Sequence, residues 1–259
     1  MEHNLTGKTA VVTGAGRGIG LAVTQALTRA GARVVAGSLT ASPDLQAAVS
    51  PGGGQALEID LSVPDGPANL VAAAGEHVDI LVNNVGSAPP RLEGFLAITD
   101  EMWRHTIDLN LMTAVRASRA AIPGMLAHGG GVIVNIGSVN ARLPDPTVLD
   151  YSASKAALVS FAKSLSKEFG PRGIRVNTVA PGPVATDLWL GADGVATQIG
   201  AASGQDPEQV AAAVAAGTVT GRFSRPDEIA DLVLFLAGPH AANMTGADVV
   251  IDGGMITTL

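Results

Sequence analysis

The stretch Lys8-Thr-Ala-Val-Val-Thr13 runs directly into Gly14-Ala-Gly-Arg-Gly-Ile-Gly20, and a helical pattern extends from Ile19 to Ala30. A short continuous run of β-forming apolar residues is typical of a buried parallel strand. A glycine turn between such a strand and a helix lets the first helical amides and the positive end of the helix dipole approach a pyrophosphate. Glycine is needed there because a Cβ would block the phosphates or hold the helix away from the sheet. The stretch therefore predicts a parallel α/β sheet with a dinucleotide site.

The spacing of these glycines is not the common Gly-x-Gly-x-x-Gly. It is Thr13-Gly14-x-x-x-Gly18-x-Gly20, because position 19 is Ile. Taken alone, the turn has an alternative interpretation as an ordinary glycine-rich connection. Motifs further along the chain are needed to decide between the two interpretations.

Further β-forming runs alternate with helical patterns, which is typical of an α/β fold. No repeat, low-complexity tract or linker interrupts the chain, so residues 1–259 are predicted to form one domain. We expect a Rossmann-like doubly wound parallel sheet of about seven strands with helices on both faces. The alternation lapses over residues 187–221, an Ala- and Gly-rich insertion with one capped helix that we interpret as a substrate lid. The predicted strands are residues 8–13, 33–37, 55–61, 78–82, 132–136, 173–179 and 249–251, and the main predicted helices are 19–30, 64–75, 99–128, 151–169 and 226–236.

The end of the second predicted strand indicates the cofactor. NAD-binding folds usually place an acid here to accept a hydrogen bond from the ribose 2′-hydroxyl. This chain has Gly37-Ser-Leu-Thr40 instead, with no acid. The planar guanidinium of Arg17, aided by the hydroxyls of Ser38 and Thr40, suits a 2′-phosphate. Arg17 could also be simply solvated, but the pattern favours NADP(H) over NAD(H).

Polar side chains come after three more strands. Asp60-Leu61 ends the third, where a carboxylate could accept from an adenine amino group, although Asp in that position is often only a helix cap. Asn83-Asn-Val-Gly86 comes after the fourth, and paired Asn side chains can tie neighbouring strand ends together. Ser138 comes after the fifth, where its hydroxyl could hold a substrate carbonyl oxygen. Ligands in open α/β sheets bind beyond the carboxyl ends of the strands, so we expect these residues at one site.

Tyr151 and Lys155 lie four residues apart at the head of a predicted helix and so share one face. An adjacent ammonium stabilises phenolate, so the pair predicts a proton donor with a lowered pKa. A surface Tyr and a solvated Lys is the alternative, although Tyr151 is the only tyrosine in the chain. Asn110 is a poor helix former inside the predicted 99–128 helix; either it lies on the surface, or its side chain or a freed carbonyl holds a water near the site.

Composition excludes several classes of function. The net charge is −7 and no basic run exceeds two residues, which argues against a nucleic-acid or anionic-membrane partner. Zero Cys excludes disulfides, and five scattered His predict no metal site. The polar N-terminus and the absence of a long apolar run predict a cytoplasmic protein without a membrane span.

Taken together and in order, these motifs resemble the short-chain dehydrogenase/reductase family over residues 5–254. One departure is Val85, where the family usually has Ala. The resemblance implies that Tyr151 donates a proton, that Lys155 lowers its pKa and binds the nicotinamide ribose, that Ser138 binds the carbonyl oxygen and that Asn110 anchors a water. The cofactor contacts it implies are Gly14, Arg17, Gly18, Ile19, Gly20, Ser38, Asp60, Leu61, Asn84, Gly86, Tyr151, Lys155, Pro181, Gly182, Val184 and Thr186.

Within the family the chain is similar to 3-oxoacyl thioester reductases. The first hypothesis is an NADP(H)-dependent oxidoreductase that transfers a hydride between nicotinamide and a ketone or secondary alcohol, with a 3-oxoacyl thioester as the candidate substrate. An NAD-dependent secondary-alcohol dehydrogenase and a non-catalytic dinucleotide sensor are the alternatives. The resemblance also implies a homotetramer, assembled through the long helices near Trp103 and Phe161 and through the C-terminal helix and strand. The 139–150 loop and the lid would shape the substrate pocket; there Arg142 would either pair with an anionic substrate group or be solvated.

Overall fold

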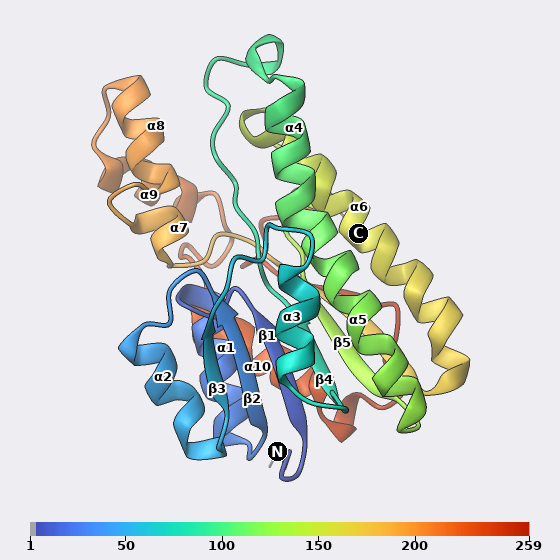
Figure 1. Ribbon diagram of the computed structural model, residues 1–259. Coiled ribbons are helices and arrows are strands. Elements are labelled where there is room, and N and C mark those ends of the chain that lie inside the picture. Colours follow the sequence, from blue (N-terminus) through green and yellow to red (C-terminus); the bar gives the residue numbers. More distant parts are fainter. Residues whose placement is uncertain (1–3, 259) are drawn as a thin grey trace.

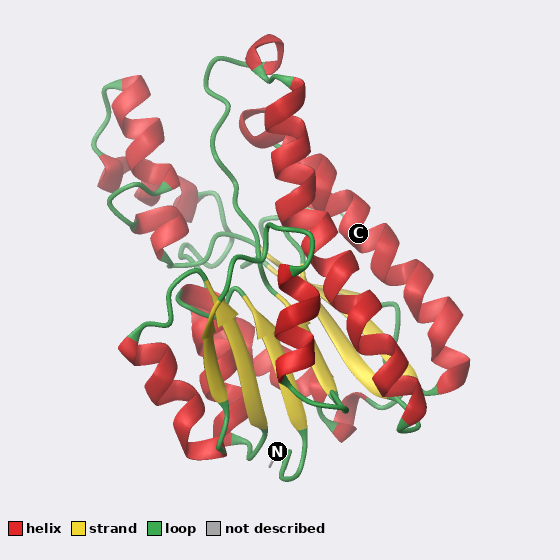
Figure 2. Ribbon diagram, viewed as in Figure 1, coloured by secondary structure: helices red, strands yellow, loops and turns green. Residues whose placement is uncertain are grey.

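A computed structural model describes residues 4–258 and contains one seven-stranded, all-parallel sheet of order β3-β2-β1-β4-β5-β6-β7 (Figures 1 and 2). Its order reverses between β1 and β4, where ligand crevices form in doubly wound sheets. The predicted fold class is confirmed. The strands are β1 (Thr9–Thr13), β2 (Arg33–Ser38), β3 (Gln55–Glu58), β4 (Ile80–Asn83), β5 (Gly131–Ile136), β6 (Ile174–Pro181) and β7 (Asp248–Ile251).

Helices cover both faces because the strands are apolar on both sides. In β1, Ala10 and Val12 enter one core while Val11 enters the other, as the two-residue period of a strand requires. The first core is closed by α1 (Gly18–Arg29), α2 (Pro43–Val49) and α10 (Pro226–Ala237). The second is closed by α3 (Gly66–Ala73), α5 (Thr113–Ala127) and α6 (Leu149–Phe169). Among residues 4–258 no helix is both long and apolar enough to cross a membrane.

Two predicted elements near the site differ from the structure in their extent or continuity. Strand β3 ends at Glu58 rather than Leu61, because the Asp60 carboxylate accepts hydrogen bonds from the Ser62 N–H and hydroxyl and turns the chain away from the sheet. The predicted 99–128 helix is divided into α4 (Asp100–Ile107), a π-helical turn (Asp108–Met112) and α5. Asn110, the residue with poor helix propensity, lies in that turn, and single π-turns in α-helices are frequent at functional sites.

The 187–221 segment is more regular than predicted. It forms α7 (Asp187–Leu190), α8 (Val195–Ser203) and α9 (Pro207–Ala216), which stand together beyond the carboxyl ends of the strands (Figure 1). The predicted cap is present, since the Asp206 carboxylate accepts the Glu208 N–H at 2.8 Å. Its abundant alanines are the strongest helix formers, which explains the regularity that the sequence interpretation missed.

The close approach of α1 to the end of β1 is possible only with glycine. Gly14 and Gly18 have φ values of +65° and +55°, in the left-handed region. A Cβ on Gly20 would lie 2.2 Å from the Gly14 carbonyl oxygen and 2.5 Å from Asn84 Nδ2. The turn, the helix and the end of β4 therefore meet at one point.

Replacing Gly20 by Ala is expected to push α1 away from the sheet and to lower the free energy of unfolding by about 1–3 kcal/mol, the usual cost of overpacking. Denaturant unfolding measures the change. Gly170→Ala is the matched control, because an added Cβ there meets no heavy atom within 4 Å. Equal stabilities of the two variants would contradict this account of the turn.

Candidate active site

A cavity of about 1120 Å³ opens at the carboxyl ends of the strands. The glycine turn, the ends of β4, β5 and β6, the head of α6 and the α7–α9 segment line it. The segments that the sequence placed at one edge of the sheet therefore do meet there. Of the predicted site residues, Gly20 and Asn110 do not line the cavity. Those that do are Gly14, Arg17, Gly18, Ile19, Ser38, Asp60, Leu61, Asn84, Gly86, Ser138, Tyr151, Lys155, Pro181, Gly182, Val184 and Thr186.

The glycine turn leaves a cradle that side chains would fill. A Cβ on Gly16 would lie 2.2 Å from the Ser38 hydroxyl oxygen, and one on Gly86 would lie 2.8 Å from Asn110 Oδ1. Gly16 was not among the predicted contacts, although it belongs to the same motif and lines the cavity. The bare backbone at the head of α1 fits the pyrophosphate of a dinucleotide.

Asn side chains join the strand ends as predicted. Asn83 Nδ2 donates to Asn135 Oδ1 at 2.9 Å across β4 and β5. Asn84 Nδ2 donates to the carbonyl oxygens of Thr13 (3.2 Å) and Gly14 (2.9 Å), which ties β4 to the glycine turn. The Asn84 bonds lie where the strand order reverses, and Asn84 and Gly14 both line the cavity.

The far end of the cradle has the hydroxyls of Ser38 and Thr40, as the sequence indicated. The Arg17 side chain is 79% exposed, and its guanidinium is 3.7 Å from the carboxylate of Asp187 on α7. Arg17 is therefore exposed to solvent and is also weakly paired with a carboxylate. This weak pair leaves most of its guanidinium donors accessible to an anion.

Ser138, Tyr151 and Lys155 are brought together because β5 ends at Ile136 and α6 begins at Leu149. The Ser138 hydroxyl lies close enough to that of Tyr151 to act on its pKa, and it donates to Asn140 Oδ1 at 3.1 Å. Lys155 is 3% exposed and lies one turn further along α6, with Nζ 5.6 Å from the centre of the Tyr151 ring. Its ammonium donates to the Ile136 carbonyl oxygen at 2.8 Å. The alternative of a surface Tyr and a solvated Lys is therefore wrong.

The electrostatics of this group differ from the sequence prediction. Burial of the hydroxyl raises the pKa of Tyr151 above its ordinary value of 10.0, and the hydrogen bond from Ser138 opposes this only in part. Burial also lowers the pKa of Lys155 from 10.5 to about 8. The predicted lowering of the Tyr151 pKa was wrong, because desolvation of the hydroxyl is the largest influence on it.

Asn110 lies behind the cavity, 2% exposed, with its side chain committed to protein partners. Its Nδ2 donates to the carbonyl oxygens of Ser87 (3.0 Å) and Thr106 (3.1 Å), and its Oδ1 accepts the Ser87 N–H at 3.1 Å. The interpretation as a surface residue was wrong.

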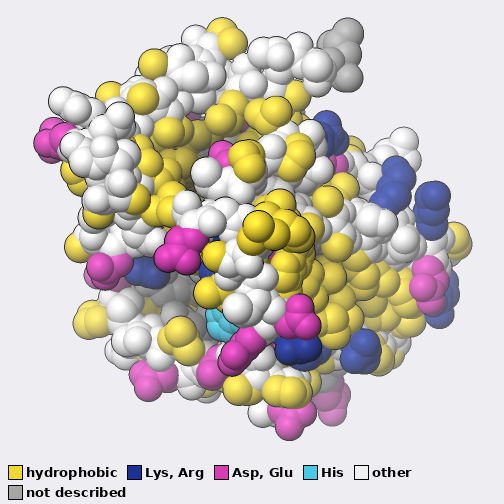
Figure 3. All heavy atoms as spheres, turned by 90° about the horizontal axis from the view of Figure 1, so that it is seen from above, with side chains coloured by type: hydrophobic (Ala, Val, Ile, Leu, Met, Phe, Trp, Pro, Cys, Tyr) yellow, Lys and Arg dark blue, Asp and Glu magenta, His cyan; other side chains and the backbone are white. Residues whose placement is uncertain are grey.

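The substrate side of the cavity is largely apolar. Arg142, which the sequence offered for an anionic substrate or for solvent, instead pairs with Asp248 on β7 at 2.9 Å. In the described chain, Arg17 and Lys155 are the only Lys or Arg side chains along the cavity. Viewed from above, hydrophobic side chains gather around its opening (Figure 3). The apolar lining includes Leu143, Pro144, Val148, Leu188, Trp189, Val195, Ile199, Val214 and Met255.

Comparisons with known proteins agree with this geometry. The family model described as enoyl-(acyl carrier protein) reductase matches residues 14–256. The 3-oxoacyl-[acyl-carrier-protein] reductase FabG of Vibrio cholerae is 35% identical over 97% of this chain and 98% of its own length. D-threitol dehydrogenase of Mycolicibacterium smegmatis is 37% identical over 98% and 94%. A crystal structure of L-sorbose reductase from Gluconobacter frateurii with NADPH and L-sorbose has a TM-score of 0.91, 32% identity and full coverage of both chains.

Fold and site define an oxidoreductase that acts on a CH–OH group or its carbonyl with NAD(P). The chain belongs to the short-chain dehydrogenase/reductase family. No group of three or more His, Cys, Asp or Glu arranged to hold a metal occurs within residues 4–258.

The buried Lys155 gives stability a defined pH dependence. Its pKa of about 8 in the folded protein lies below the ordinary 10.5, so the unfolded chain binds more protons between these values. Stability contributed by this group is therefore full above pH 10.5 and is lost as the pH falls towards 8. Lys155→Met keeps the apolar stem and removes the charge, and should raise the free energy of unfolding at pH 7 by up to about 3 kcal/mol.

Denaturant unfolding at several pH values measures this effect. Lys167→Met, at an exposed position of the same helix, is the matched control. The gain in Lys155→Met should shrink as the pH rises from 8 to 10. A variant less stable than the wild-type protein at pH 7 would show that the ammonium is stabilising where it lies.

Proposed function

We propose that the chain is an NADP(H)-dependent reductase of neutral ketones, with 3-oxoacyl thioesters as the favoured substrate class. The observation that carries the proposal is the group of Ser138, Tyr151 and buried Lys155 at the inner end of a glycine-lined cradle. A bound nicotinamide would exchange a hydride with the substrate carbon. The protein must then manage the charge and the proton at the substrate oxygen.

The residues divide this work. The Ser138 hydroxyl would hydrogen-bond the carbonyl oxygen as negative charge develops there. Tyr151 would donate the proton, and its raised pKa keeps the phenol protonated at neutral pH, as reduction requires. Lys155 would face the ribose and stabilise the phenolate after transfer. Asn110 would hold the segment behind them in place, with its carbonyl available to a water.

The cradle would hold the dinucleotide along its length. The helix-start residues Gly18, Ile19 and Gly20 would present amides to the pyrophosphate, and Pro181 to Thr186 would seat the nicotinamide. Arg17 and Ser38 would bind a 2′-phosphate. Asp60 and Leu61 would border the adenine, with Asp60 engaged mainly in its own turn with Ser62. Gly14, Asn84, Gly86, Gly182 and Val184 complete the proposed contacts.

The apolar substrate side supports a ketone with a neutral, apolar body. Arg142 would not serve an anionic substrate, since it is paired with Asp248. The α7–α9 segment would act as the lid over this body. Residues 1–259 would act as one domain in the cytoplasm. The homotetramer stays a prediction, supported by partly exposed Trp103 and Phe161 on α4 and α6.

An NAD-dependent secondary-alcohol dehydrogenase is the second candidate, favoured by the threitol dehydrogenase likeness. Oxidation would need Tyr151 as phenolate, which its raised pKa opposes at neutral pH. A dinucleotide sensor without chemistry has less support. Such a protein would not need to keep a costly buried ammonium beside a phenol.

Tyr151→Phe tests the proton donor. It removes one hydroxyl, so we expect at least a hundredfold loss of kcat, the lower range for acid–base catalysis, with cofactor affinity within about twofold of the wild-type value. NADPH oxidation with an acetoacetyl thioester, L-sorbose and a free 3-oxo acid measures both chemistry and substrate class. The thioester should be preferred. Substantial activity in Tyr151→Phe would remove Tyr151 from the mechanism.

Cofactor preference is tested by titrating NADPH and NADH against protein fluorescence. NADPH should bind at least tenfold more tightly, since charge-assisted hydrogen bonds add about 1.5–3 kcal/mol. Arg17→Gln should remove most of the difference without weakening NADH. Arg29→Gln, also on the α1 side of the sheet but outside the cavity, is the control. Equal affinities in the wild-type protein would reject NADP(H) as the preferred cofactor.

A further inference from the structure

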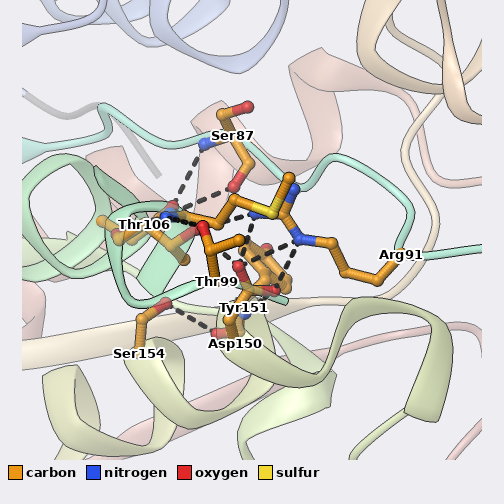
Figure 4. Close-up of polar contacts among 9 residues, drawn as sticks. Ser87, Arg91, Thr99, Thr106, Asp150, Tyr151 and Ser154 are labelled. Carbon is orange, nitrogen blue, oxygen red and sulfur yellow. Dashed lines mark hydrogen bonds and ion pairs between the residues drawn. The ribbon is translucent and has the colours of Figure 1, made fainter. Parts of the chain in front are cut away.

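A buried ion pair lies directly beside Tyr151, and the mechanism above does not use it. The Asp150 side chain is 0% exposed. The Arg91 guanidinium donates to both of its oxygens, with Nε at 3.3 Å from Oδ1 and 3.1 Å from Oδ2, and Nη2 at 2.5 Å from Oδ2 (Figure 4). Thr106 Oγ1 donates to Oδ2 at 2.7 Å. Each acceptor oxygen of this carboxylate is therefore occupied.

The pair is connected to the catalytic turn of α6. Asp150 Oδ1 accepts the Tyr151 N–H at 3.1 Å, one of the first-turn amides that has no partner within the helix. The acid at this position also suits the positive end of the α6 dipole. The main chain of Tyr151 is thus hydrogen-bonded to the same Asp150 carboxylate that binds the Arg91 guanidinium.

The same network holds two walls of the cavity. The main-chain N–H of Arg91 donates to the Thr147 carbonyl oxygen at 2.6 Å. Four residues earlier, the main-chain N–H and carbonyl of Ser87 are both hydrogen-bonded to the Asn110 side chain. Segment 87–91 is therefore fastened at both ends. Ser87 and Thr147 both line the cavity, so the segment that carries the Arg91 side chain is bonded to two of its walls as well as, through Asp150, to the turn of Tyr151.

Charge explains why the arrangement is specific. Burial acts to raise the pKa of Asp150, but hydrogen bonds from Arg91 and Thr106 outweigh it and hold the pKa below the ordinary range. The pair is ionised at neutral pH. A buried ion pair adds little stability compared with apolar packing of the same volume, whereas its two-pronged geometry fixes orientation.

We propose that Arg91 and Asp150 are positioning residues, which hold the Tyr151 hydroxyl and the 87–91 wall in the geometry that the reaction needs. This inference rests on the proposed role of Tyr151. It adds two residues that touch neither the reacting oxygen nor the cradle. Figure 4 shows Arg91 reaching from the segment after β4 across to the head of α6.

Arg91→Met tests the proposal, with Arg104→Met as the matched control, because Arg104 on α4 is 73% exposed and pairs with the exposed Asp100. Tyr151 is the only tyrosine, so protein labelled with ¹³C at the tyrosine ring gives one NMR signal from this residue. Arg91→Met should shift or broaden that signal and lower kcat by about 10–100-fold, the range expected from a misplaced catalytic group. NADPH affinity should stay within about twofold.

The control variant should change none of these readouts. Arg91→Lys keeps the charge but loses the two-pronged bond, so it should give an intermediate kcat; it also serves if Arg91→Met fails to fold. An unchanged tyrosine signal with a normal kcat in a folded Arg91 variant overturns the proposal. So does a loss of kcat that is matched by an equal loss of NADPH affinity. A wild-type protein without reductase activity would reject the proposed function instead, while the tyrosine signal would still report whether Arg91 positions Tyr151.

Discussion

The site depends on how closely the first helix can approach the sheet. With no side chain at Gly20, the head of α1 lies against the Gly14 carbonyl, and the Asn84 amide bonds to that same oxygen. This single point joins the turn after β1 to the end of β4, on the two sides of the strand-order reversal. A crevice must form there, because the crossover helices leave the sheet in opposite directions. The contact places the glycine turn and the end of β4, which both line the cavity.

Two buried charges beside the cavity are handled in different ways. The Lys155 ammonium donates to a carbonyl oxygen, and burial lowers its pKa to about 8. Asp150 is matched by Arg91 and by Thr106, and stays ionised. The Lys155 ammonium is costly to keep charged, so its protonation is suited to change when a charged group binds beside it. The second is balanced within the protein and is suited to fix positions. Both occur within the first two turns of α6.

The cavity itself separates a polar half from an apolar half. The glycine turn, the hydroxyls after β2 and the backbone after β6 form the polar half, while side chains from the 139–148 segment and α7–α9 form the other. The chain is similar both to acyl-thioester reductases and to a sugar reductase, which differ in what they reduce. We therefore expect the specificity of this chain to be a property of the apolar half.

The sequence by itself determined the class of sheet and the meeting of Ser138, Tyr151 and Lys155, because periodicity and glycine spacing are local consequences of backbone geometry. Only the tertiary structure decided what each polar group faces. The pKa of Tyr151 moved opposite to the prediction because burial in the folded protein desolvates its hydroxyl. Arg142 pairs with Asp248, which is 106 residues away in the chain, and Asp150 pairs with Arg91, which is 59 residues away. No local pattern specifies such pairs, since they exist only once the chain has folded.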